Sequence, residues 1–180
     1  HKHSVHHAFI ENKGQWSENI LFKTRFQGGN LWVEQGKLLF HLQNFTAYQK
    51  AHGNPLYVAG SDSYTQHVVH LNFAGSNTVH NITKEKPTEA YYNYFLGNNK
   101  NKWASGVRGY SEATLHDLYN GIDFKLIEEN EELKYEFHVL PGTNPSIIKL
   151  DYAGHNKLEI DKSGNLLVKT PLGIIQEKKP

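Results

Sequence analysis

The sequence of 180 residues contains no cysteine, and this absence excludes three kinds of site. Structural disulfides, catalysis by a thiolate and zinc bound by cysteine all need a residue that the chain does not have. The chain also lacks methionine, from which we expect a processed product or an excerpt of a longer protein. Only Arg25 and Arg108 can offer the planar guanidinium fork that clamps phosphates and carboxylates.

The chain also has little net charge and no long apolar run. The formal net charge is +1, so we expect no strong field that would draw in nucleic acid or an anionic membrane. No apolar run approaches the roughly 20 residues that a membrane helix needs. We therefore expect neither a nucleic-acid partner nor membrane insertion. What the chain does contain is 9 Phe, 3 Trp and 10 Tyr, which bring enough area for a packed core.

Apolar and polar residues alternate along most of the chain, which is typical of half-buried strands. Residues 122–126 and 133–139 alternate in this way around the acidic segment 128–132, which predicts a hairpin with a charged tip. Residues 31–42 predict a second hairpin that turns at Gln35-Gly36. Further strands are predicted at 20–26, 67–73, 107–115, 147–152, 165–170 and 173–178, and segment 111–119 allows one short helical turn at most.

Many short strands separated by turn residues predict an all-β domain. We expect an antiparallel two-sheet β-sandwich of a jelly-roll-like kind, with little or no helix. A single domain of this kind is predicted over residues 9–180, after a flexible His-rich arm at residues 1–8.

Histidines suggest a metal site only at the N-terminus. If His1 carries a free amine, that amine, two backbone nitrogens and the imidazole of His3 could wrap Cu(II) or Ni(II), as in any chain with His at the third position. Such a site is adventitious. His67 and His70 lie three residues apart on a predicted strand and therefore face opposite sides. We predict no functional metal site and no cofactor.

Catalytic residue types occur together once. His116-Asp117, with Ser111 upstream and Asp123 downstream, contains the residues of a nucleophilic triad, but no G-x-S-x-G elbow is present. The glutamates of segment 128–132 lie in a predicted hairpin tip, where burial cannot raise their pKa. We expect a non-enzymatic chain and keep a hydrolase near His116 and Asp117 as a third alternative.

Residues 91–110, YYNYFLGNNKNKWASGVRGY, contain six aromatic side chains. In one hypothesis Tyr92, Tyr94 and Trp103 stack on sugar rings and Arg108 hydrogen-bonds hydroxyl groups. In the other, the rings point inward and residues 97–102 form a polar loop over the end of the sandwich. The two hypotheses correspond to a carbohydrate-binding module and to a structural module.

The spacing of these rings favours packing over a ligand platform. Tyr92 and Tyr94 share one face of a strand, whereas Tyr91 and Phe95 share the other. Neither face is purely polar, so we expect both to be covered. Trp103 is the main exception, because it follows a run of Asn and Lys where a loop is expected. For Arg108 we expect a carboxylate partner such as Asp123, or stacking on a ring.

Five segments together resemble one known domain: 9–16 (FIENKGQW), 91–110, 118–126 (LYNGIDFKL), 133–154 (LKYEFHVLPGTNPSIIKLDYAG) and 157–173 (KLEIDKSGNLLVKTPLG). The chain from Phe9 to Pro180 resembles the uncharacterised N-terminal domain of large secreted proteins of Gram-negative bacteria. Those proteins carry seven-bladed-propeller-type repeats, immunoglobulin-like or polycystic-kidney-disease-type modules, and C-terminal sorting domains of the gliding-motility or type IX secretion kind. Residues 44–66 match least well.

The resemblance implies a β-rich fold, export and a modular parent protein. We therefore expect an extracellular or cell-surface location, and a role in structure, anchoring or recognition. The expected partners are downstream domains of the same polypeptide and, beyond them, a glycan or a surface protein. The resemblance supplies no catalytic residue and no mechanism.

Overall fold

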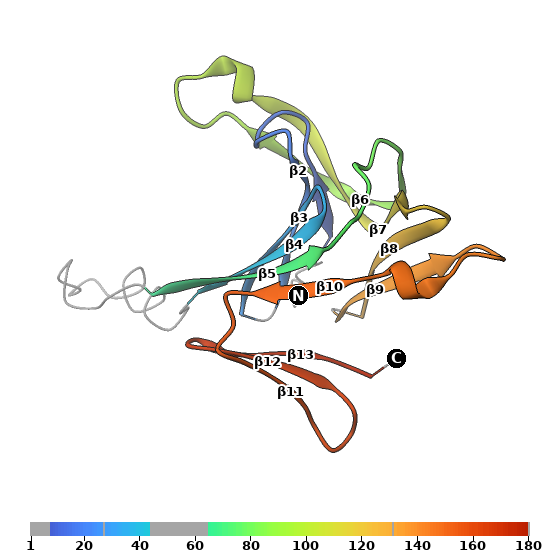
Figure 1. The fold of residues 1–180 in the computed structure, drawn as a ribbon. Helices are drawn as coiled ribbons and strands as arrows, with labels where there is room; N and C mark the ends of the chain where they lie inside the picture. The colour runs from blue at the N-terminus through green and yellow to red at the C-terminus, as the bar shows by residue number, and fades with distance from the viewer. Residues whose placement is uncertain (1–7, 27, 44–64, 131, 180) are drawn as a thin grey trace, which may run out of the picture.

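The computed structural model describes residues 8–26, 28–43, 65–130 and 132–179. They form a curled antiparallel sheet of ten strands and a separate sheet of three (Figure 1). Nine strands of the large sheet lie in the order β10-β5-β4-β3-β2-β1-β7-β8-β9, and β6 joins it by pairing with β7. The small sheet has the order β11-β12-β13.

The strands have these bounds in chain order: β1 Phe9–Glu11, β2 Ile20–Phe26, β3 Gly29–Glu34, β4 Lys37–Gln43, β5 Gln66–Phe73, β6 Ile82–Tyr94, β7 Ala104–Tyr119, β8 Ile122–Glu129, β9 Glu132–Val139, β10 Leu150–Ala153, β11 Lys157–Ile160, β12 Leu166–Thr170 and β13 Gly173–Glu177. Single 3-10 turns at Lys100–Lys102 and Pro145–Ile147 are the helical elements of the described residues.

The β3–β4 hairpin shows how the sequence pattern produces the fold. Alternate residues of both strands are buried, as a strand with one covered face requires. Gly36 has a φ of 71° at the turn, which favours glycine. At the other end, a Cβ on Gly29 would lie 1.9 Å from the carbonyl oxygen of His41, so only glycine fits there. The predicted hairpin and its turn are confirmed.

The inner face of the curled sheet forms the core. Phe73 on β5 packs against Phe124 on β8 at 4.9 Å between ring centroids, and against Phe137 on β9 at 6.2 Å. These contacts join strands from opposite ends of the sheet order, so the curl brings its two ends face to face. Phe9 and Phe22 are also almost fully buried in this cluster.

The small sheet packs on the large sheet beside its two edge strands, β9 and β10 (Figure 1). Val168 on β12 and Ile175 on β13 belong to the core cluster. Glu177 accepts hydrogen bonds from the hydroxyls of Tyr135 on β9, at 2.7 Å, and Tyr152 on β10. One carboxylate on β13 therefore ties together both edges of the curled sheet.

The structure confirms an all-β, antiparallel fold that is nearly free of helix. The jelly-roll-like sandwich stays a prediction, because the sheet order is one large curled sheet and one small sheet. Segment 111–119 continues strand β7 without a helical turn, and β10 begins only at Leu150, later than the predicted start at 147. Ala8, assigned to the flexible arm, is buried. The copper or nickel site at His1 and His3 falls outside the described residues.

Candidate functional site

The β6–β7 hairpin projects from the curled sheet (Figure 1). β7 pairs with β1 at Gly109 and Tyr110, and with β8 only from Glu112 onward. The segment of β7 before Arg108 therefore pairs with β6 alone. Beyond these strands one face of the ribbon is open to solvent, whereas on the other face Ala104 and Val107 are buried, with 5% and 0% of their surface exposed.

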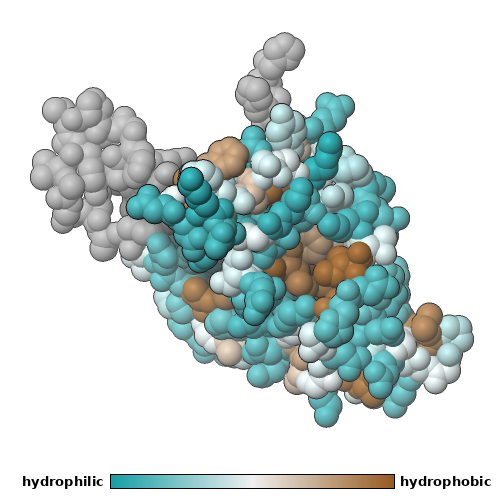
Figure 2. Space-filling view, turned by 90° about the horizontal axis from the view of Figure 1, so that it is seen from above, coloured by the Kyte–Doolittle hydropathy of each residue, from teal (hydrophilic) through white to brown (hydrophobic). Residues whose placement is uncertain are grey.

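The end of this ribbon exposes large apolar side chains, which we call the hydrophobic tip. The exposed fractions are 61% for Tyr91, 42% for Tyr92, 57% for Phe95, 79% for Leu96 and 39% for Trp103. The expectation that both faces of the aromatic stretch are covered is therefore wrong, because the ribbon extends beyond the strands that would cover it. Figure 2, seen from the side on which the hairpin projects in Figure 1, shows brown hydrophobic residues reaching the surface among hydrophilic ones.

Trp103 braces the loop at the end of the hairpin. Its indole N–H donates to the carbonyl oxygen of Gly97 at 3.2 Å, and its ring meets Phe95 edge to face at 5.7 Å. The ammonium of Lys100 lies 5.8 Å from the centre of the same ring. Asn99 caps the 3-10 turn by accepting from the backbone N–H of Asn101. The tip is thus held in one shape by its own contacts.

Tyr92 of the hydrophobic tip also contacts Tyr94, which belongs to a second cluster of rings. Their centroids are 6.5 Å apart, and Tyr94 meets Trp16 at 5.6 Å, which in turn meets Trp32 at 5.3 Å. The two contacts of Trp16 are edge to face, so these rings cover one another. Burial, and then the neighbouring Tyr92, raise the pKa of the Tyr94 hydroxyl.

Trp16 and Trp32 are the site residues that sequence reasoning missed. Trp16 follows β1 in the loop before β2, and Trp32 lies on β3. The ammonium of Lys23 lies 4.7 Å from the centre of the Trp32 ring. Lys13 holds the loop against the hairpin by donating to the carbonyls of Ser105 and Gly106 at 3.4 Å. Local sequence patterns do not predict contacts between residues so far apart in the sequence.

Arg108 lies at the base of the tip, across from Tyr91. Its guanidinium donates to the carbonyl oxygen of Thr88 at 3.3 Å, whereas Asp123 accepts from His116. The expected Arg108–Asp123 pair is therefore wrong. The backbone N–H of Arg108 donates to Glu11 at 3.2 Å.

Glu11 fastens the hairpin to the body of the domain. Besides the bond from Arg108, its carboxylate accepts from the ammonium of Lys84 on β6 at 2.6 Å. Burial by itself would raise the pKa of Glu11, but the hydrogen bonds from Lys84 and from the Arg108 backbone bring the net pKa below its usual value. The carboxylate is therefore charged at neutral pH and bridges β1, β6 and β7.

Charge is distributed unevenly along the hairpin. Residues 90–110 contain no Asp or Glu but carry Lys100, Lys102 and Arg108. Closer to the body, Glu112 pairs with Lys125 at 2.6 Å and with Lys86. Hydrogen bonds from these two lysines, Lys125 first, lower the pKa of Glu112. The base of the hairpin is thus neutralised by ion pairs, whereas the tip has only positive charge.

His116, Asp123 and Thr83 are arranged like the base, the acid and the hydroxyl of a catalytic triad. The Nδ1 of His116 is 2.9 Å from a carboxylate oxygen of Asp123, and its Nε2 is 2.7 Å from the hydroxyl of Thr83. With Nδ1 protonated, Nε2 accepts from Thr83, which is how a base activates a nucleophile. Of the residues predicted with His116, Asp123 is therefore its partner, whereas Asp117 is exposed and Ser111 donates to Glu128 at 3.4 Å.

The arrangement of His116, Asp123 and Thr83 is explained by a structural role of Asp123. Asp117 has a φ of 52°, and the pairing of β7 with β8 shifts register between Leu115 and Tyr119. The second carboxylate oxygen of Asp123 accepts from the backbone N–H of Asp117 at 2.8 Å. Asp123 therefore holds this β-bulge in place. Neither hollow described below is lined by His116 or Thr83.

Comparison with protein families shows what the chain is similar to. Residues 9–180 match the family model of a domain of unknown function, DUF7948. The chain belongs to this family. The curated proteins and the solved structures contain no significant match to it. The described residues of this DUF7948 domain contain no group of three or more potential metal ligands. They also contain no helix that is long and apolar enough to span a membrane.

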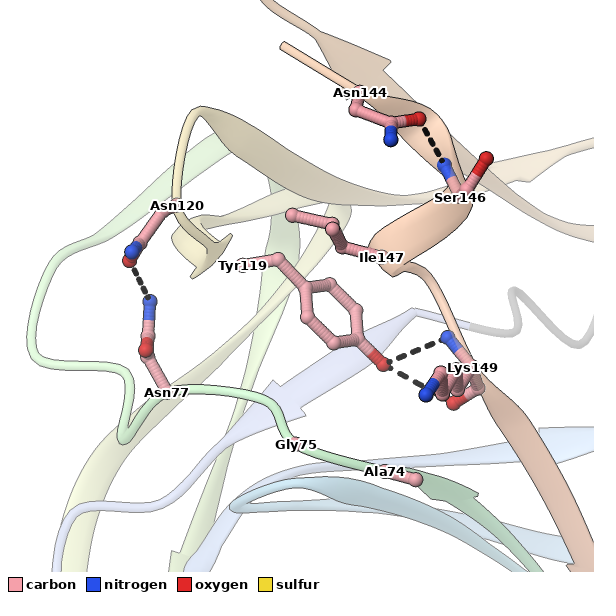
Figure 3. A pocket seen from close by; sticks show the side chains of 9 residues that line it. All are labelled: Ala74, Gly75, Asn77, Tyr119, Asn120, Asn144, Ser146, Ile147 and Lys149. Atoms are coloured by element: carbon pink, nitrogen blue, oxygen red, sulfur yellow. Dashed lines mark hydrogen bonds between the residues drawn. The ribbon is translucent and has the colours of Figure 1, made fainter.

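Two hollows lie on the surface of the DUF7948 domain. The first, of about 370 Å³, lies between the end of β7 and the loop before β10 (Figure 3). In it the Tyr119 hydroxyl donates to the Lys149 carbonyl at 3.1 Å, and Asn77 donates to Asn120 at 3.0 Å. Its polar groups are thus bound to one another. The second, of about 480 Å³, lies beside Trp16 and Lys84. Neither hollow is lined by Tyr92, Tyr94, Trp103 or Arg108.

Proposed function

We propose that this DUF7948 domain is a non-enzymatic module of a large exported or cell-surface bacterial protein, and that it anchors or recognises through the hydrophobic tip. The exposure of the tip is the observation that supports this. Leu96 and Phe95 expose 79% and 57% of their surface on a braced hairpin. Contiguous apolar side chains at a protein surface mark interaction sites more often than solitary ones do.

The outer part of the hairpin contributes little to the core, which further supports a role in binding. The core cluster and the side chains packed against it include no residue from Thr83 to Gly109, a range that the structure describes in full. The same residues form the longest ribbon of the fold. Val107 and Ala104 are buried locally, outside that cluster. A segment that adds little to the central core yet keeps a defined shape is well suited to contact a partner.

The cellular setting of the proposal comes from the resemblance of the five segments to N-terminal domains of secreted Gram-negative proteins. A location outside the cell, type IX secretion and partners in downstream domains follow as parts of the proposal. In that setting the curled sheet carries the hairpin, and the rest of the parent protein supplies other activities.

A binding experiment with isolated cell envelopes of a Gram-negative bacterium tests the proposal. We expect the fluorescently labelled chain to sediment with the envelopes, and the double variant Phe95→Ser/Leu96→Ser to bind at least tenfold more weakly because it loses the apolar contact area. The matched control Ile160→Ser/Ile174→Ser removes two similarly exposed side chains, 68% and 58%, from the small sheet. Equal binding by both double variants would refute a role for the tip.

Carbohydrate binding is the second candidate function, because Tyr92 and Trp103 expose 42% and 39% of their surface and Arg108 lies near Tyr91. Tyr94 is less available, since it packs against Trp16. A glycan array and sedimentation with insoluble polysaccharides separate this candidate from the first. Hits that disappear in Tyr92→Ala and Trp103→Ala would favour it, whereas an array without hits would count against it.

A further inference from the structure

We propose that the hydrophobic tip docks onto the surface of a membrane that contains anionic lipids. Phe95 and Leu96 enter the boundary between head groups and acyl chains, and Lys100 and Lys102 face the lipid phosphates. The inference rests on the proposed function, since it names the partner of the same surface. It concerns shallow docking by a hairpin and requires no spanning segment.

The kinds of side chain at the tip suit a lipid interface. Phe95 and Leu96 are at the turn, and Leu96, at 79%, is the most exposed large hydrophobic side chain among the residues that the structure describes. Tyr91, Tyr92 and Trp103 follow on the ribbon, and such rings prefer the head-group level of a bilayer. Lys100 and Lys102 lie in the same terminal loop, and Arg108 lies across from Tyr91, farther from the turn. The tip thus combines exposed apolar side chains, amphipathic rings and cationic groups.

The charge of the tip selects an anionic surface. The net charge of +1 for the whole chain conceals a local imbalance, because the outer ribbon, residues 87–110, carries three cations and one acid, Glu89. Long lysine side chains can keep their ammonium groups at the phosphates while their stems lie along apolar surface. Lysine and arginine side chains close to an anionic leaflet each strengthen binding about fivefold.

The shape of the tip favours a lipid surface over a sugar chain or a rigid protein. Sugar rings need flat, open aromatic faces, but Phe95 and Trp103 meet edge to face at 72° and partly cover each other. A leucine at the end of a projecting turn offers no hydrogen bond to a hydroxyl group. A projecting apolar turn needs a binding partner that is deformable or concave. A bilayer interface accepts such a turn without a preformed pocket.

Sedimentation with sucrose-loaded vesicles tests the inference. We expect the wild-type chain to bind vesicles of phosphatidylcholine with 30% phosphatidylglycerol, and to bind pure phosphatidylcholine far more weakly. Binding should decrease as salt is raised, because salt screens the cations. Phe95→Ser/Leu96→Ser should bind at least tenfold more weakly, and Lys100→Gln/Lys102→Gln about 30-fold more weakly.

The matched charge control is Lys162→Gln/Lys179→Gln, which removes two exposed lysines from the region of the small sheet. It should bind like the wild type. Absence of vesicle binding, or equal binding by the tip variants and the controls, would overturn the lipid inference. If envelope binding still depends on Phe95 and Leu96 in that case, the proposed function stands and the partner is a protein or a glycan. If envelope binding is also absent, the proposed function fails as well.

Discussion

Replacing Glu177 with Ala is expected to lower the free energy of unfolding by about 3 kcal/mol, since hydrogen bonds to a charged group contribute about 1.5–3 kcal/mol each. The carboxylate accepts from both Tyr135 and Tyr152, which lie on the two edge strands of the curled sheet. Its loss leaves two partly buried hydroxyls without their shared acceptor. It also loosens β13, which places Ile175 over the core.

Urea unfolding followed by far-UV circular dichroism measures this effect. The neighbouring Gln176→Ala is the control, because Gln176 is exposed on the same strand and should change stability by less than about 0.5 kcal/mol. A Glu177→Ala protein as stable as the wild type would show that the small sheet is held by apolar contacts alone.

The second large effect is a loss of stability in alkali. Burial, followed by the charge of Glu177, raises the pKa of both Tyr135 and Tyr152 far above the ordinary value of 10.0. Above pH 10 the unfolded chain loses these two protons while the folded chain keeps them. A raised pKa in the folded state means that stability is fully present below pH 10 and is lost as the pH rises. Each tyrosine contributes a slope of about 1.4 kcal/mol per pH unit, so the pair contributes about 2.7.

Urea unfolding at pH 9, 10 and 11 measures that slope. The double variant Tyr135→Phe/Tyr152→Phe lacks both hydroxyls and should lose this part of the alkaline dependence, while other tyrosines keep theirs. A variant with the same alkaline slope as the wild type would contradict the assignment. The experiment reports on the closure of the curled sheet and is independent of the hydrophobic tip.

Strands with one buried and one exposed face were predictable from sequence, whereas strands exposed on both faces and very short strands were not. Residues 20–26 alternate because β2 lies in the middle of the sheet, and the predicted and observed bounds agree. Only the end of β6, near Tyr92 and Tyr94, was predicted as a strand. The remainder of its 13 residues was missed, because most of its side chains are exposed on both faces and no alternation arises. β1 and β11 have only three and four residues, too few for a periodic pattern.

The candidate site was predictable in its residue types but not in its environment. The sequence pointed to Tyr92, Tyr94 and Trp103, and the face shared by Tyr92 and Tyr94 is consistent with their ring contact. Whether the rings are covered depends on where β1 and β8 stop pairing with β7, which no local pattern reveals. The contact of Trp16 with Tyr94 and the contact of Thr83 with His116 are likewise set by the register of distant strands.

The central claim is that Phe95 and Leu96 form a binding surface and do not fill the core. The free energy of unfolding of Phe95→Ser/Leu96→Ser tests it most directly, because a binding surface can be removed without cost to the fold. We expect a change of less than about 0.5 kcal/mol relative to the wild type. A loss of more than about 2 kcal/mol, as burial of such side chains would produce, would contradict the account.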